Sequence, residues 1–148
     1  MIPKPVLKAL IQKRLDDAKV LLKNRRYSAT IYISGYALEL ALKYRICLLM
    51  KFTNGFPESR DEFNSYYSNT RKVLLRNTIR ELRDIRHHDL QILIRYSGEQ
   101  VNIETSFSTE WNYVKHWNPE MRYVNSIIRK QRASDFLKNI RVIVNEIL

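Results

Sequence analysis

The sequence predicts an all-α fold, an antiparallel bundle of about five or six helices in one domain spanning residues 1–148. The length suits a single hydrophobic core. Only three glycines and four prolines are present, which disfavours a turn-rich β-sandwich or a glycine-rich phosphate loop. Hydrophobic residues make up 45% of the chain, and long segments repeat them at helical spacing.

Two long helices are predicted in the first third of the chain. Apolar residues recur every three or four positions from Pro3 to the polar segment “KNRRYS”, which indicates the first helix. The second covers “ATIYISGYALELALKYRICLLMKF”, with Ser28 near its start, and is apolar on most sides, so we expect it to be the central helix. Gly35 lies inside it at a cost of about 1 kcal/mol relative to alanine. We therefore expect a neighbouring helix to approach closely there.

A break and a basic helix follow. The segment “TNGFPES” contains the clearest turn residues of the chain. A polar, tyrosine-bearing stretch then leads into “TRKVLLRNTIRELRDIR”, which we expect to be helical. Its predicted buried stripe consists of Val73, Leu74, Ile79, Leu82 and Ile85.

The second half of the chain predicts three more helices. A short one covers “LQILIRYSG”, with Gly98 as its C-terminal stop. The following “EQVNIETSF” is expected to be irregular or briefly extended. Another helix starts at Ser108 and breaks at the Asn-Pro pair of “HWNPE”. The last helix is expected to run from about Met121, or a little later, to Leu148.

The charge of the chain favours a polyanionic partner. A net charge of +11 and a pI near 9.9 are typical of proteins that bind nucleic acid. Arginine, which supplies more of this charge than lysine, binds phosphate through two parallel donors. Because the charge is spread along the chain, several solvated helix faces are the alternative. The candidate nucleic-acid-binding residues are Arg76, Arg80, Arg86 and His87, the last being alternatively a solvated residue at a helix end.

Other functional classes are disfavoured. A lone cysteine, Cys47, excludes an internal disulfide and a multi-cysteine zinc site. The N-terminal segment lacks the uninterrupted apolar region of a signal peptide. The longest apolar stretch contains Glu39, Lys43 and Arg45, so it does not predict a membrane span. We expect a cytoplasmic protein with no cofactor and no metal site.

Several segments resemble HEPN domains. “RLDDAKVLLKNRR” and “YSATIYISGYALELALKYRI” are similar to the opening helix pair of that family. “HDLQILIRYSG” and “WNPEMRY” resemble two later elements, so the resemblance covers nearly the whole chain in order. It implies an antiparallel bundle that commonly dimerises, in toxin–antitoxin, defence or nucleotidyltransferase-associated systems of prokaryotes. The residues that match family motifs are Ala37, Glu39, Leu42 and Lys43 in “A-x-E-x-x-L-K”, and Arg122 and Tyr123 in the Arg-Tyr element.

The resemblance also implies a catalytic motif. Catalytic HEPN domains are metal-independent ribonucleases with an arginine, a polar residue and a histidine, matched here by Arg83, Asp84 and His88. Such cleavage needs a base for the ribose 2′-hydroxyl, a cation on the phosphate and a proton for the leaving oxygen. Histidine suits proton transfer and arginine suits phosphate. His88 would then be the general base or acid, with Arg83 on the phosphate and Asp84 orienting one of them.

The same residues have a structural alternative. His88 and Asp89 begin a predicted helix, where Asp89 or a preceding polar group caps exposed amides. The competing functional classes are a non-catalytic module that pairs with a nucleotidyltransferase-type partner, and RNA or nucleotide binding without cleavage. A solvent-open cleft shared by His88 and Arg83 of two chains would favour the enzyme. A buried His88 bonded within its own chain would oppose it.

Further polar and aromatic residues have two interpretations each. Glu39 and Lys43, four residues apart, form either an orienting ion pair or a ligand-binding pair. We expect Arg122 to pair with an acidic group such as Glu39, and His116 to pack between two tryptophans. The aromatic residues that offer stacking faces for single-stranded RNA, or alternatively belong to the core or a dimer interface, are Tyr66, Tyr67, Tyr96, Trp111, Tyr113, Trp117 and Tyr123.

Overall fold

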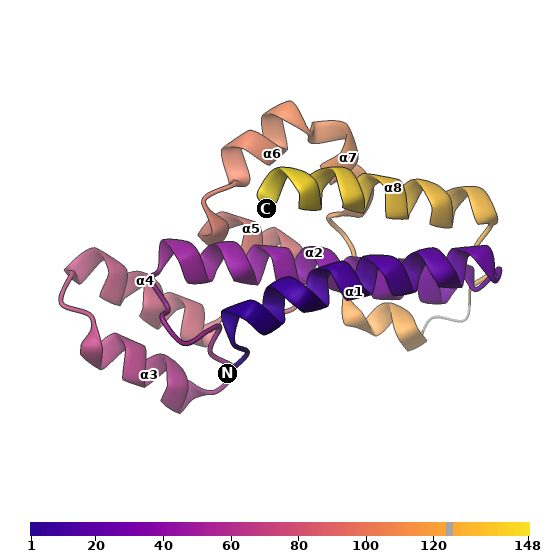
Figure 1. The fold of residues 1–148 in the computed structure, drawn as a ribbon. Coiled ribbons are helices and arrows are strands. Elements are labelled where there is room, and N and C mark those ends of the chain that lie inside the picture. Colours follow the sequence, from indigo (N-terminus) through magenta and orange to yellow (C-terminus); the bar gives the residue numbers. More distant parts are fainter. Residues whose placement is uncertain (124–125) are drawn as a thin grey trace.

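The computed structural model describes residues 1–123 and 126–148, and this part of the chain is helical, without a β-strand (Figure 1). The all-α prediction is therefore confirmed, whereas the helices exceed the five or six expected. A single antiparallel bridge joins Ile2 and Phe56. The described elements are α1 (Lys4–Lys23), α2 (Tyr27–Leu49), α3 (Arg60–Asn69), α4 (Val73–Asp84), α5 (Leu90–Ser97), α6 (Gln100–Ser106), α7 (Ser108–Val114), the 3₁₀ helix η1 (Pro119–Tyr123) and α8 (Lys130–Ile147).

Helix α2 is the centre of the fold. Its apolar side chains surround most of the helix, and it contacts α1, α5, α8 and η1. Figure 1 shows α1 and α8 running alongside it. Each fully buried aliphatic side chain contributes about 1.5–3 kcal/mol to this packing. Cys47 of α2 is buried, and burial raises the pKa of its thiol to about 12, so it is an unreactive core residue.

Gly35 allows a close approach to α2. A Cβ at this position would lie 2.1 Å from Nε1 of Trp117. The Trp117 indole is buried there, with the ring of Tyr36 edge-on at a centroid distance of 5.0 Å. The close approach that we expect at Gly35 is therefore present, although it comes from the segment after α7 rather than from a helix.

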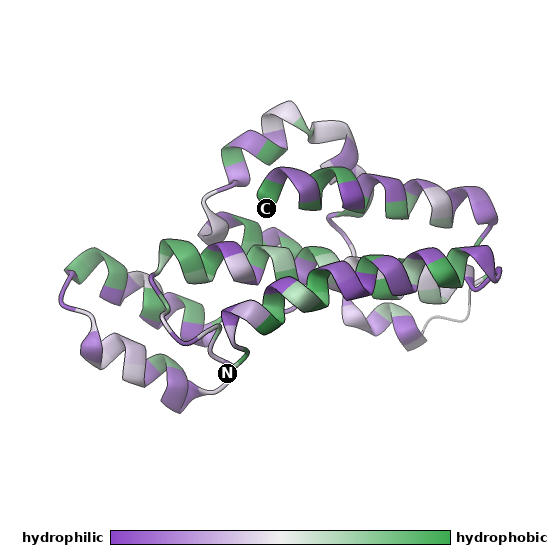
Figure 2. Ribbon diagram, in the orientation of Figure 1, coloured by the Kyte–Doolittle hydropathy of each residue, from purple (hydrophilic) through white to green (hydrophobic). Residues whose placement is uncertain are grey.

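Helices α3 and α4 form an arm at one end of α2 (Figure 1). Ser59 begins α3 with a capping box to Glu62. Ile79 is buried in α4, but Val73 and Leu74 are 71% and 78% exposed, and Figure 2 shows this apolar start of α4. The predicted buried stripe is wrong at these two positions, because the first turn of α4 lies at the tip of the arm, beyond the bundle core.

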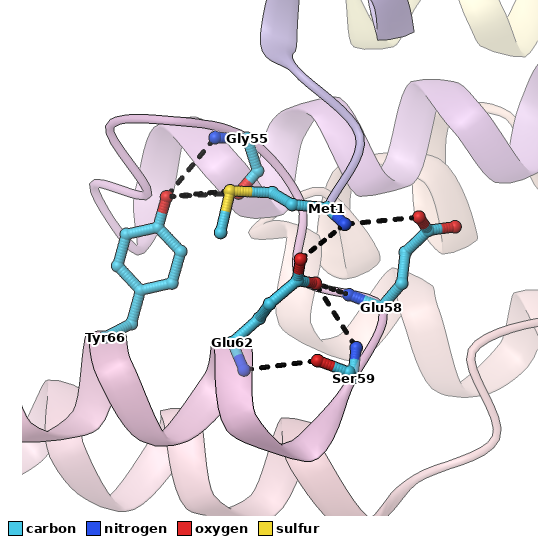
Figure 3. Close-up of polar contacts among 6 residues, drawn as sticks. All are labelled: Met1, Gly55, Glu58, Ser59, Glu62 and Tyr66. Atoms are coloured by element: carbon cyan, nitrogen blue, oxygen red, sulfur yellow. Dashed lines mark hydrogen bonds and ion pairs between the residues drawn. The ribbon is translucent and has the colours of Figure 1, made fainter.

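The first residues of the chain fasten the base of the arm (Figure 3). The Met1 ammonium lies 2.7 Å from Oε1 of Glu62, and the hydroxyl of Tyr66 accepts a hydrogen bond from the Gly55 amide at 3.3 Å. Gly55 has a φ of +145°, and a Cβ there would lie 2.1 Å from the carbonyl oxygen of Ile2. Glycine is therefore required where the two segments cross.

The second half of the chain corrects two expectations. Residues 100–106 form α6 instead of an irregular segment, and the helical conformation buries the side chain of Ile103. The last helix begins at Lys130, later than Met121, because Met121 belongs to η1. Gly98 ends α5 in the left-handed conformation, with φ +80°, as the sequence predicts. No helix of the described residues is long and apolar enough to cross a membrane.

Candidate functional site

A buried ion pair lies in the middle of α2. Lys43 Nζ donates a hydrogen bond to Glu39 Oε1 at 2.7 Å, and the two side chains are 6% and 3% exposed. Their spacing of four residues places them on one face of the helix. The ion pair that the sequence offers as one interpretation is therefore present. Since both charges are removed from water, either one left alone would be strongly destabilising.

His88, in the loop between α4 and α5, reaches the same carboxylate. Its Nδ1 lies 3.1 Å from Oε1 and 3.0 Å from Oε2 of Glu39. An ionised carboxylate only accepts hydrogen bonds, so Nδ1 carries a proton, and in the neutral tautomer of this geometry the lone pair is on Nε2. The His88 side chain is 60% exposed. A buried carboxylate therefore orients an imidazole whose ring is open to solvent.

His88 lines a surface pocket of about 630 Å³. The pocket lies between residues 86–91, at the start of α5, and residues 115–122, at the end of α7 and in η1. Its size falls within the usual range of small-molecule sites. The charged and titratable side chains that line it are Arg86, His88, Asp89, Lys115, His116, Glu120 and Arg122.

The pocket favours an anion. Its three cations outnumber its two carboxylates even when both histidines are neutral. Asp89 is moreover engaged in capping α5, since its Oδ1 accepts hydrogen bonds from the amides of Gln91 at 2.9 Å and Ile92 at 3.2 Å. This cap is the structural role that the sequence predicts for Asp89. Two arginines beside an oriented imidazole are a suitable set of groups for a phosphate.

Arg83 and Asp84 form a separate cluster on the arm. Arg83 Nη1 donates to Oδ1 of Asn64 at 2.9 Å, and its Nη2 donates to Oδ2 of Asp84 at 3.2 Å. Asp84 also accepts a hydrogen bond from Arg60 at 3.1 Å. The Asp84 carboxylate raises the pKa of Arg83, and the bonded guanidinium lowers the pKa of Asp84. Neither residue lines the pocket of His88, so a single chain does not assemble the expected catalytic set there.

His87 is packed rather than solvated. Its ring lies 5.5 Å from the ring of Phe56 and 5.2 Å from that of Phe63, between centroids. Its Nε2 donates to the carbonyl oxygen of Leu82 at 2.6 Å, and burial lowers its pKa. The expectation of a solvated helix end is wrong, because α4 stops at Asp84 and the next turn directs His87 into this aromatic cluster.

The three arginines predicted to contact nucleic acid lie in two different parts of the molecule. The guanidinium of Arg76 lies over the ring of Tyr67 at 4.5 Å, on the arm. Arg80 is exposed on the same helix. Arg86 is exposed and lines the pocket. Of these three arginines, Arg86 alone lies beside His88.

Arg122 does not bond to Glu39, whose carboxylate is already occupied. Its Nη1 donates to the hydroxyl of Tyr32 at 3.3 Å, and its guanidinium lies 4.7 Å from the centroid of the Tyr123 ring. The Tyr32 and Tyr36 hydroxyls are 3.3 Å apart. Bonding to Tyr36 and Arg122 lowers the pKa of Tyr32, whereas desolvation raises that of Tyr36. The acidic partner predicted for Arg122 is thus replaced by a tyrosine.

His116 lines the pocket, a position that the sequence did not predict. The residue is exposed, whereas the neighbouring Trp111 and Trp117 are buried, so the expected packing between them is wrong. It follows the end of α7 and precedes Pro119, the first residue of η1. The helix break at Asn118 and Pro119 was a signal of an exposed turn, but nothing local indicated that the turn faces His88.

No family model and no solved structure matches this chain. Within residues 1–123 and 126–148, no group of three or more histidine, cysteine, aspartate or glutamate side chains is placed to hold a metal ion.

Proposed function

We propose that this chain is a HEPN-like protein, acting in the cytoplasm as a homodimer of a toxin–antitoxin or defence system, that cleaves RNA in the His88 pocket without a metal ion. One observation carries the proposal: a buried carboxylate, Glu39, holds an exposed imidazole at the edge of a pocket lined by arginines. The two segments that meet there, “A-x-E-x-x-L-K” and “HDL”, are also two of the segments that resemble the HEPN family.

The reaction is a transesterification. Nε2 of His88 takes the proton of the ribose 2′-hydroxyl, the 2′ oxygen forms a bond to phosphorus, and the bond from phosphorus to the 5′ oxygen breaks. Glu39 stabilises the imidazolium that results. Arg86 and Arg122 balance the negative charge that develops on the phosphate oxygens. Protonated His116 gives its proton to the leaving 5′ oxygen, so the products are a 2′,3′-cyclic phosphate and a 5′-hydroxyl.

The test compares RNA cleavage by the wild-type protein and by the variants His88→Ala, Arg122→Ala and Arg83→Ala in the presence of EDTA. We expect cyclic phosphate ends from the wild type and a loss of about 10²–10⁴-fold in the rate for His88→Ala, the usual contribution of a general base. Arg122→Ala should slow cleavage, and Arg83→Ala should leave most of it. Thermal melting of each variant controls for loss of the fold.

Two results would overturn this assignment. Equal cleavage by the wild type and His88→Ala, or by neither, would exclude His88 as the base. Loss of cleavage in Arg83→Ala with full cleavage in Arg122→Ala would favour the catalytic arginine that the HEPN resemblance implies, supplied by a second chain.

Binding of RNA or a nucleotide without cleavage is the second candidate. The position of Arg83 favours it, because this arginine is bonded to Asn64 and Asp84 on the arm rather than placed beside His88. In that case the wild-type protein would bind RNA in the pocket and leave it intact. A non-catalytic module for a nucleotidyltransferase-type partner would instead bind neither RNA nor nucleotide.

A further inference from the structure

An exposed aromatic ring lies against Arg122, a residue that lines the pocket. Tyr123 ends η1 and is 75% exposed. The guanidinium of Arg122 lies over its ring at 4.7 Å, while Arg122 also lines the pocket and bonds to Tyr32. A guanidinium covers one face of an aromatic ring, and the exposure of Tyr123 leaves surface for a second flat group. The ring is therefore available for stacking directly beside Arg122, one of the cationic side chains of the pocket.

The other aromatic candidates are less exposed than Tyr123 or lie away from the pocket. Tyr66 and Tyr67 are half-buried on the arm, where Tyr66 contacts the loop at its base and Tyr67 lies under Arg76. Tyr96 donates to Glu81 at 3.4 Å. Trp111 and Trp117 are buried in the core. Tyr113 is 36% exposed and packs against Phe136, and neither it nor the arginine over its ring, Arg132, lines the pocket.

We propose that Tyr123 is a stacking platform for an unpaired base of single-stranded RNA, next to the nucleotide whose phosphate lies in the His88 pocket. The inference rests on the RNA substrate of the proposed function, but not on cleavage. Bases in a duplex are stacked on each other and leave no face for a protein ring, so the platform selects single strands. Arg122 then serves two adjacent groups: it contacts the phosphate and supports the ring that carries the base.

The experiment measures binding of a fluorescein-labelled single-stranded 2′-O-methyl RNA octamer, which the reaction above cannot cleave, by fluorescence anisotropy. We expect Tyr123→Ala to raise Kd by about five- to 150-fold, the range for loss of one stacked base. Tyr123→Phe keeps the aromatic face and should stay within about twofold of the wild type. Tyr113→Ala is the matched control, since the guanidinium of Arg132 also lies over that ring, at 5.7 Å; its Kd should not change.

An abasic octamer sharpens the test. It should bind the wild-type protein as weakly as the intact octamer binds Tyr123→Ala, and the variant should bind both octamers equally. Unchanged binding by Tyr123→Ala, equal losses in Tyr123→Ala and Tyr123→Phe, or no binding by the wild type would each overturn the platform. A Tyr123 effect without RNA cleavage refutes the ribonuclease and supports the platform, whereas cleavage without a Tyr123 effect does the reverse.

Discussion

Two polar clusters flank the loop between α4 and α5, and they differ mainly in their exposure to water. Glu39 binds Lys43 and His88 inside the bundle, at the edge of a pocket. Asp84 binds Arg83 on the surface of the arm. In each cluster a carboxylate bonds to a cation and to one further side chain. The two differ in their environment: the Glu39 cluster is buried and held in place by the surrounding helices, whereas the Asp84 pair is solvated.

Substitutions at the exposed cluster should be tolerated better than substitutions at the buried one. Both partners of a surface ion pair stay hydrated, and salt screens their attraction. Removing such a pair therefore has little effect on the free energy of unfolding. A buried pair has lost its hydration, so each charge depends on the other. The Glu39 cluster is also held by α2, the helix with the most buried residues, whereas Asp84 lies at the end of α4.

Removal of one carboxylate from each cluster gives the largest expected contrast. Glu39→Ala leaves the Lys43 ammonium buried without its partner and should lower the free energy of unfolding by about 3–5 kcal/mol. Asp84→Ala should leave the unfolding midpoint nearly unchanged, because Asp84 is exposed. Urea denaturation followed by circular dichroism measures both. Equal effects of the two substitutions would mean that the Glu39 pair is solvated.

A double variant separates stability from the orientation of His88. Glu39→Leu with Lys43→Met replaces the buried pair by apolar groups, which is often neutral or stabilising. We expect this protein to be more stable than Glu39→Ala and yet to lose the carboxylate that holds Nδ1 of His88. If it also cleaved RNA at the wild-type rate, Glu39 would have no part in the reaction.

A substitution at Gly35 compares tight packing in the core with an exposed position on the arm. Alanine would place a Cβ against the buried indole of Trp117. Displacing the ring by overpacking costs about 1–3 kcal/mol. Alanine gains about 1 kcal/mol in helix propensity over glycine, so we expect Gly35→Ala to lower the free energy of unfolding. Asn77→Ala, at an exposed position of α4, is the control and should change stability by no more than about 0.5 kcal/mol. A stabilised Gly35→Ala would show that the ring yields without cost.

The sequence pattern predicted the features of the buried cluster that lie within one helix. The spacing of Glu39 and Lys43 indicated the ion pair as one of two interpretations, and the apolar character of most sides of α2 predicted its central position. The contact of His88 with Glu39 joins residues 49 positions apart, and no periodicity reports such a contact. Val73 and Leu74 fit the helical pattern but lie at the tip of the arm, because periodicity predicts a face and not what covers it.

His87 gives the smallest expected effect, a pH dependence of stability. Burial lowers the pKa of His87 below that of a histidine in the unfolded chain, about 6.5. Neutral His87 therefore stabilises the fold fully above about pH 6.5, and this contribution is lost as the pH falls through the lowered pKa.

The unfolding free energy of the wild type should fall more steeply between about pH 7 and 5 than that of His87→Gln. Carboxylates such as Glu62 and Asp84, whose pKa values are lowered, are the same in both proteins, so they cancel in the difference. Parallel curves for the wild type and His87→Gln would mean that His87 is solvated in the folded protein.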